Sequence, residues 1–295
     1  MKQTRYLRTV FLVLVFVASF GVTSLAMWGG GRSKPAVPKA QGKTAPAFKP
    51  TKFKPACVNP SYPMPAPTSA PAIDAQCGLA GAGAGPEGQQ DMVKNNFCAK
   101  GTPEEITVAD LIGLQAKVVA NPAINFGSAN EGSRKRGPTT NRAPLKKLGE
   151  GKLVTLSKVF VLIARQEGGE SVNCGKNVAD HALFHDIHIS LVASPAVTDE
   201  CSSVVAEMSP HHRPDAWNHG NVEKVSKANL PVRVTGQLYF DSSHFPCSGS
   251  AGAGAGNPKR IALWEIHPIY KFEVCTADCD GDGQWVALDK WAAQQ

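Results

Sequence analysis

The chain has 295 residues, of which 42% are hydrophobic and 19% charged, and its formal net charge is +7, so its length allows one or two folded domains. Ten of its 31 Lys and Arg residues precede residue 74, where no Asp or Glu occurs, and the remainder therefore holds 21 basic against 24 acidic residues. Because a nucleic-acid-binding domain normally has a basic surface of its own, this distribution argues against nucleic acid as a partner.

The N-terminus has the pattern of a targeting segment. Lys2, Arg5 and Arg8 precede an apolar run over residues 10–28, which predicts a signal peptide or an uncleaved signal-anchor helix over residues 1–28. Small residues at 24 and 26 suit cleavage after Ala26, yet the run is also close to the length needed to cross a bilayer. Both alternatives predict export to the bacterial periplasm or cell envelope, and the second adds a membrane anchor formed by residues 10–28.

The next two segments differ in composition. Residues 29–75 are rich in Pro, Lys and Ala, which predicts a disordered, extended linker. Residues 76–150 predict a small helical and loop segment. One helix is expected over 86–97, with Pro86 in its first turn, and another over 107–119, where Thr107 and Asp110 have capping-box spacing. Residues 121–151 are expected to form a charged, solvated loop.

From residue 151 to residue 277 the pattern is mainly β. Runs rich in Val, Leu and Ile, each closed by turn residues, predict strands over 152–165, 185–194, 203–209, 232–241 and 262–275. A short helix is expected over 221–228. Three strands, a helix and two strands is the element order of the OB-fold, a five-stranded barrel. The segment 278–295 is expected to be an acidic loop followed by a C-terminal helix over 285–293.

Five short motifs resemble those of a group of uncharacterised exported bacterial proteins with an OB-like domain, over roughly residues 77–291. They are Glu170–Cys174, Asp186–Ile189, Val234–Gln237, Trp264–Pro268 and Trp285–Trp291. The resemblance implies an OB-fold-like barrel and an exported location, and it implies no activity.

Alternation along three strands predicts one polar face. Period-2 alternation directs the apolar side chains of strands 185–194, 203–209 and 262–275 into the barrel. The polar residues left on the outer face, where OB domains usually bind ligands, are Asp186, His188, Glu207, Glu265 and His267. Such a set can pair across strands on a solvated sheet, bind a ligand or a metal such as Zn²⁺, or transfer protons.

A second motif has the spacing of a calcium-binding loop. Its acidic residues are Asp278, Asp280, Asp282 and Asp289, which stand at positions 1, 3, 5 and 12 of the pattern. Position 12 is normally Glu, and a strand rather than a helix precedes the loop. The alternatives are a structural Ca²⁺ site and a free acidic turn that caps the final helix.

Eight cysteines at 57, 77, 98, 174, 201, 247, 275 and 279 predict disulfides in an oxidising compartment. Cys77–Cys98 is the pair expected across the first helix.

These features together predict an exported, envelope-tethered binding or structural module of unknown ligand that uses the outer face of an OB-like barrel. The alternative is an exported metal-dependent hydrolase with a His/carboxylate site. No catalytic residue is assigned.

Overall fold

The computed structural model describes residues 57–62, 73, 77–124, 141–166, 168–175, 181–247, 257–280 and 282–295. The contacts within the chain define two units, Met1–Ala45 and Pro46–Gln295, and every described residue belongs to the second. The predicted signal segment and most of the predicted linker lie outside the described residues. None of the described helices is both long and apolar enough to cross a membrane.

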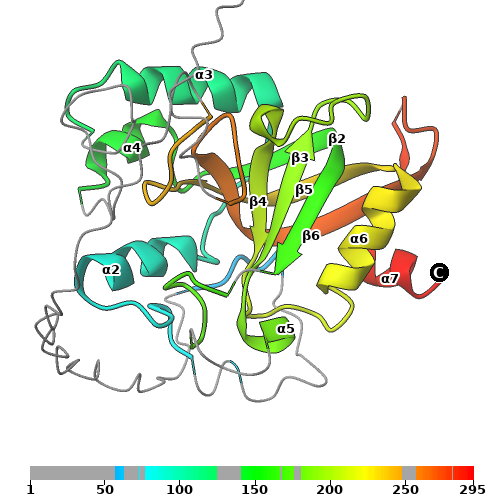
Figure 1. Ribbon diagram of the computed structural model, residues 1–295, viewed down its shortest axis with the longest axis horizontal. Helices are drawn as coiled ribbons and strands as arrows, with labels where there is room; N and C mark the ends of the chain where they lie inside the picture. The colour runs from blue at the N-terminus through cyan, green and yellow to red at the C-terminus, as the bar shows by residue number, and fades with distance from the viewer. Residues whose placement is uncertain are drawn as a thin grey trace, which may run out of the picture. The chain divides into compact units, whose positions relative to one another are not determined.

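Five strands close into a mixed β-barrel (Figure 1), which confirms the mainly β prediction for this part of the chain. The strands are β2 (Leu153–Gln166), β3 (Ile187–Val192), β4 (Val204–Met208), β5 (Pro231–Phe240) and β6 (Trp264–Ala277). Their order is β2-β3-β4-β6-β5, and pairing of β5 with β2 completes the ring. Neighbouring barrel strands are antiparallel except β4 and β6, which are parallel.

Strand β2 closes the barrel by pairing with two different strands. Its first half pairs with β5 and its second half with β3. Within the half that pairs with β5 the register shifts between Leu156 and Val159, where Lys158 has a φ of 56°. An irregularity of this kind bends a strand and increases its twist, which allows a single strand to turn the corner of a small barrel.

Two further strands extend the sheet. β1 (Glu104–Ile106) lies parallel to β2, and β7 (Gln284–Ala287) pairs antiparallel with β6. The helix predicted over 285–293 is therefore wrong in its first half, and α7 spans only Leu288–Ala292. The turn after β6 brings Trp285 opposite Cys275, so pairing with a strand edge overrides the local helical pattern.

The helices are α2 (Gly85–Lys94), α3 (Val108–Val119), α4 (Ala143–Leu148), α5 (His181–Phe184) and α6 (His219–Ala228), with a 3₁₀ turn η1 at Glu200–Ser202. The predicted α2, α3 and α6 are present, and the capping box of α3 is confirmed. Helix α4 lies in the stretch predicted to be a loop, so that prediction is wrong for residues 143–148. In Figure 1, α2 and α3 lie on one side of the barrel and α6 and α7 on the other.

The apolar face predicted for the strands is the barrel interior. One core cluster contains Ile187, Ile189 and Leu191 of β3, and it also contains the alternate residues Val204, Ala206, Met208, Trp264 and Ile266 of β4 and β6. Helix α6 closes this core with Val222 and Val225. The opposite faces of the same strands therefore point out of the barrel.

Four disulfides link the described cysteines, and none of these cysteines is free: Cys57–Cys98, Cys77–Cys174, Cys201–Cys247 and Cys275–Cys279. The predicted Cys77–Cys98 pair is wrong. The amide of Ala82 donates to the carbonyls of Ser171 and Asn173, so the segment before α2 runs beside residues 171–174. This pairing brings Cys77 to Cys174.

Candidate metal centre

The outer face predicted to be solvated is instead covered. Asp186, His188, Glu207, Glu265 and His267 are each at most 1% exposed. The C-terminal end of α2 lies over them, as a set of hydrogen bonds shows. The side-chain amide of Gln237 donates through Nε2 to the Val93 carbonyl at 2.9 Å and to the His267 carbonyl at 2.8 Å. The hydroxyl of Ser209 donates to Asn95 Oδ1 at 2.8 Å. Single-sequence periodicity gives the direction of a side chain but not what packs on top of it.

Strand register brings the predicted residues together. His188 of β3 stands opposite Glu207 of β4. Ala206 of β4 stands beside Ile266 of β6, so the next residues along, Glu207 and His267, lie on the same outer face. His188, Glu207 and His267, for which alternation predicts a common outer face, therefore lie close together across neighbouring strands.

Three nitrogens surround one oxygen of Glu207. Its Oε2 lies 3.1 Å from His267 Nε2, 3.2 Å from Lys94 Nζ and 3.3 Å from His188 Nε2. Despite these distances, five of these polar atoms make no aligned hydrogen bond within the described part of the chain. They are both oxygens of Glu207, both ring nitrogens of His188 and Nε2 of His267. These polar atoms therefore lie close together without satisfying one another's hydrogen bonds.

Two residues not predicted from the sequence join this group. Glu170 Oε1 lies 3.7 Å from His188 Nε2 and 3.6 Å from His244 Nε2, and Glu170 Oε2 lies 3.2 Å from Lys94 Nζ. Ligand atoms of Glu170, Asp186, His188 and Glu207 all lie within 4.8 Å of one another. We call Glu170, Asp186, His188, Glu207 and His267 the His/carboxylate cluster. Glu170 and His244 come from loops, where no periodic pattern indicates direction.

The spacing within the cluster is that of a ligand shell. Bonds of about 2.1 Å to a tetrahedral ion place neighbouring ligand atoms about 3.4 Å apart. The nitrogen–oxygen distances to Glu207 are 3.1 and 3.3 Å, and His267 Nε2 lies 3.8 Å from Asp186 Oδ2. Both Asp186 carboxylate oxygens are buried without a hydrogen-bond partner among the described residues. The donor set of imidazoles and carboxylates therefore suits an ion such as Zn²⁺ in both chemistry and spacing.

Two imidazoles are oriented through their other nitrogen. His267 Nδ1 lies 2.8 Å from the Lys94 carbonyl, which only accepts, so Nδ1 carries the proton and Nε2 is directed to the cluster. His244 Nδ1 lies 2.6 Å from Asp241 Oδ2 in the same way. Metal-binding histidines are usually fixed by this arrangement, in which the second ring nitrogen donates to a carbonyl or carboxylate.

The buried carboxylates of the cluster control the protonation of the imidazoles beside them. Burial alone would lower the pKa of His188 and His267, but the neighbouring Glu207 carboxylate outweighs it and raises the pKa of His188 to about 9 and that of His267 to about 10. Burial alone would raise the pKa of Glu207, but His188 and Lys94 hold it well below its usual value. Without a metal, two protonated imidazoles and one ammonium therefore compensate the buried carboxylates.

Glu265 lies at the side of the cluster. Its Oε2 accepts from Arg260 Nη1 at 2.7 Å, and the same guanidinium lies 3.5 Å from Asp241 Oδ2. Burial and the nearby Glu207 raise the pKa of Glu265 well above its usual value. The carboxyl group of Glu265, which the sequence had grouped with the ligands, is paired with Arg260 through Oε2.

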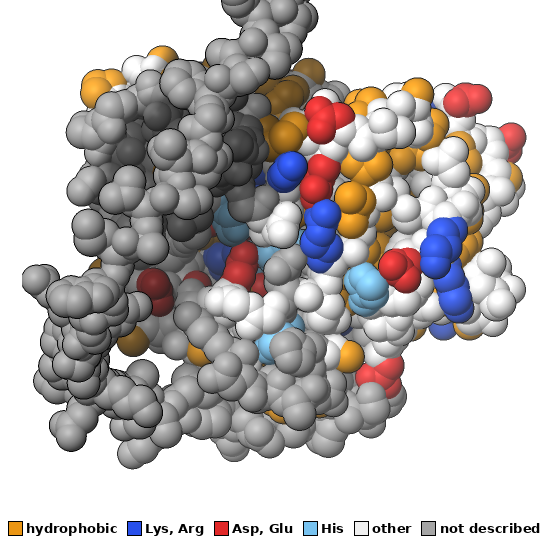
Figure 2. All heavy atoms as spheres, in the orientation of Figure 1, with side chains coloured by type: hydrophobic (Ala, Val, Ile, Leu, Met, Phe, Trp, Pro, Cys, Tyr) orange, Lys and Arg blue, Asp and Glu red, His pale blue; other side chains and the backbone are white. Residues whose placement is uncertain are grey.

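Figure 2 shows histidine, acidic and basic side chains near one another on the part of the described surface that faces the viewer. Of the residues in and beside the cluster, Glu170 and His244 are partly exposed, with 21% and 12% of the side chain. Contact with solvent is therefore greatest on the Glu170 side.

The acidic loop has a different structure. Within the described ranges, Asp278, Asp280, Asp282 and Asp289 belong to no group of converging ligand atoms. Lys158 Nζ donates to the Asp280 carbonyl at 2.9 Å, and the Asp282 carbonyl accepts from Trp285 Nε1. Asp289 lies in α7. A calcium ion at this loop stays a prediction.

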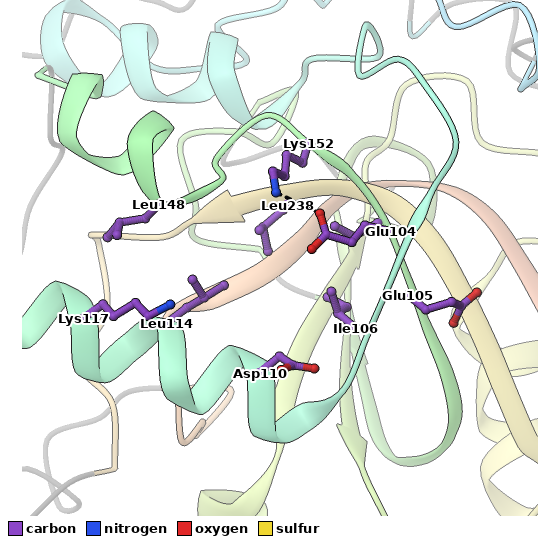
Figure 3. A pocket seen from close by; sticks show the side chains of 10 residues that line it. Glu104, Glu105, Ile106, Asp110, Leu114, Lys117, Leu148, Lys152 and Leu238 are labelled. Carbon is purple, nitrogen blue, oxygen red and sulfur yellow. Dashed lines mark hydrogen bonds and ion pairs between the residues drawn. The ribbon is translucent and has the colours of Figure 1, made fainter.

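A surface pocket between α3 and the sheet offers no competing site. It has a volume of about 290 Å³ and is floored by Ile106, Leu114 and Leu238 (Figure 3). Three of its charged residues are already engaged: Lys152 pairs with Glu104 at 2.8 Å, and Asp110 caps α3. The pocket shares no residue with the His/carboxylate cluster.

Comparisons with known proteins identify no relative: no family model, curated protein or solved structure matches this chain.

Proposed function

We propose that this protein is an exported binding module built on an OB-fold, and that its ligand is a divalent transition metal such as Zn²⁺ held in the His/carboxylate cluster. The barrel's connectivity supports the OB-fold: the helix α6 lies between its third and fourth strands, and the third and fifth strands are parallel neighbours. The recessed ligands lie on the barrel face that OB domains generally use for binding.

Export is supported by two independent features. The basic and apolar N-terminal pattern is that of a targeting segment, and four disulfides are typical of an oxidising compartment. If the targeting segment stays uncleaved, residues 10–28 tether the module to the membrane.

One observation carries the metal proposal. The Nε2 atoms of two buried histidines lie 3.1 and 3.3 Å from one Glu207 oxygen without a hydrogen bond to it. Glu170, Asp186, His188 and Glu207 would hold the ion, with His267 as a further donor. A bound ion would link β3, β4 and β6 to the loop that carries Glu170, which is a structural role.

The alternative is a metal-dependent hydrolase. A catalytic ion needs an open coordination position that substrate can reach. Glu207, His188 and His267 are fully buried, and only the Glu170 side is partly exposed. This burial favours a binding or structural ion over a catalytic one.

The test is a zinc titration of the chelator-stripped full chain by calorimetry, together with elemental analysis. We expect one equivalent of zinc to bind, and we expect His188→Ala and Glu207→Gln each to weaken binding by roughly tenfold or more, since each removes a ligand. His219→Ala is the matched control, because His219 lies on α6 and contacts the Ala164 carbonyl outside the cluster.

No zinc binding by the native protein, or equal binding by the cluster variants and the control, would refute the proposal. Hydrolysis of a model ester by the zinc-loaded protein that is lost in Glu207→Gln would instead favour the hydrolase.

A further inference from the structure

A lysine ammonium already lies inside the His/carboxylate cluster. Lys94, the last residue of α2, has its side chain 3% exposed, and its Nζ lies 3.2 Å from Glu170 Oε2 and 3.2 Å from Glu207 Oε2. Both carboxylates belong to the group of four proposed metal ligands. A buried ammonium shared by two ligands supplies the charge that a metal would otherwise bring.

We propose that Lys94 competes with the metal for the site, an inference that rests on the proposed function. The Lys94 ammonium occupies the site in the metal-free protein, and a bound metal displaces it towards Glu265. The site is then never left as uncompensated buried carboxylates, which would be strongly destabilising. Metal affinity is set by the free energy of moving the ammonium as well as by the ligands.

The reason for displacement is repulsion between like charges. An ammonium and a divalent ion held by the same two carboxylates would lie within a few ångströms of each other, where repulsion in a protein interior amounts to several kcal/mol. Glu207 directs the same Oε2 to Lys94 and to both histidines, so we expect an ion bound to that oxygen at about 2 Å to displace Lys94 from it.

The structure provides a place for the displaced ammonium. Glu265 Oε1 lies 3.9 Å from Lys94 Nζ, and this buried oxygen has no hydrogen-bond partner among the described residues. The backbone of α2 is held separately, since the Val93 carbonyl accepts from Gln237 and the Lys94 carbonyl from His267. We therefore expect the side chain of Lys94 to move by rotation about its own bonds while the helix stays in place.

The test compares zinc affinity in full-length variants by competition with a chelator of known affinity. Lys94→Met is expected to bind zinc about tenfold more tightly than the native protein, because no ammonium has to leave. Its metal-free form is expected to melt at a lower temperature. Lys117→Met is the matched control, since Lys117 is exposed on α3, and it should leave zinc affinity unchanged.

Glu265→Gln tests the displaced position independently. It is expected to weaken zinc binding by about tenfold, and this effect is expected to vanish in the Lys94→Met background, because no ammonium then needs the carboxylate. If Lys94→Met does not fold, native-like zinc affinity in Glu265→Gln alone overturns the inference.

The outcomes separate the two proposals. If the native protein binds zinc and Lys94→Met binds it equally or more weakly, Lys94 does not compete with the metal. The metal site itself is then still supported. Absence of zinc binding by the native protein overturns the metal site itself.

Discussion

Glu207 shows at the scale of a single residue why buried charges occur together here. A lone carboxylate with 0% exposure would be protonated or strongly destabilising. Its oxygen instead contacts two imidazoles and an ammonium, and their charges keep it ionised. The histidines in turn gain protons from the same contact. Each group therefore has its charge state only because the others are present.

This mutual dependence predicts how stability varies with pH in the metal-free protein. Burial alone would lower the pKa of His188 and His267, but Glu207 raises the pKa values to about 9 and about 10, against 6.5 for the free side chain. Because each histidine has a higher pKa in the folded than in the unfolded state, its protonation stabilises the folded protein. This stabilisation is complete below pH 6.5 and is lost as the pH rises to 9 and 10. We expect the free energy of unfolding to fall in that window by about 1.4 kcal/mol per pH unit for each histidine.

The measurement is urea unfolding in a chelator between pH 6 and pH 10. His188→Gln is expected to remove part of the decline, and His219→Ala is expected to leave it unchanged. A stability profile that stays flat in the native protein across pH 7–10 would contradict the assignment of these two imidazoles as protonated.

At the scale of secondary-structure elements, glycine controls how closely β5 and β6 approach. A Cβ on Gly236 would lie 2.4 Å from the Pro268 carbonyl oxygen and 2.6 Å from Ile266 Cγ2. Pro268 follows His267, so any shift of β6 away from β5 also moves that imidazole. The bulge in β5–β6 pairing at Gly236 thus positions a cluster residue.

Gly236→Ala is therefore expected to destabilise the fold by roughly 1–3 kcal/mol through overpacking and to weaken zinc binding, as measured by chemical unfolding and zinc titration. Gly220→Ala is the matched control: an added Cβ in α6 meets only Asn218 Oδ1 at 3.5 Å, and alanine favours a helix by up to about 1 kcal/mol. Equal effects of the two substitutions would show that the close approach at Gly236 has no special role.

The elements also show how far the sequence predicts this molecule. Alternation in β3, β4 and β6 predicts the barrel strands and the common face of His188, Glu207 and His267, because these depend on local periodicity. The covering of that face by α2 depends on contacts between distant segments, such as His267 with the Lys94 carbonyl. Burial, Lys94 and the loop residue Glu170 were missed for this reason, as was the strand β7.

At the scale of the whole molecule, two disulfides fasten the loops that complete the cluster. Cys77–Cys174 joins the segment before α2 to the loop of Glu170, and Cys201–Cys247 joins the approach to β4 to the segment that follows His244. The barrel strands thus supply the cluster residues on the outer barrel face. The two disulfides hold the loops of Glu170 and His244 over that face.

Removal of Cys77–Cys174 should accordingly affect both stability and zinc binding. The bridge closes a loop of 97 residues, whereas Cys275–Cys279 spans only 4. The loop-entropy relation gives roughly 5 kcal/mol for the first and roughly 2 kcal/mol for the second. We expect the Cys77→Ser/Cys174→Ser variant to unfold at much lower denaturant concentration and to bind zinc more weakly, since the Glu170 loop is no longer held.

The Cys275→Ser/Cys279→Ser variant is the matched control, because its bridge joins the C-terminal end of β6 to the loop that follows it and includes no residue next to a member of the cluster. It is expected to lose less stability and to keep native zinc affinity. If both variants bind zinc as the native protein does, the Cys77–Cys174 bridge is not needed for zinc binding, which contradicts this prediction.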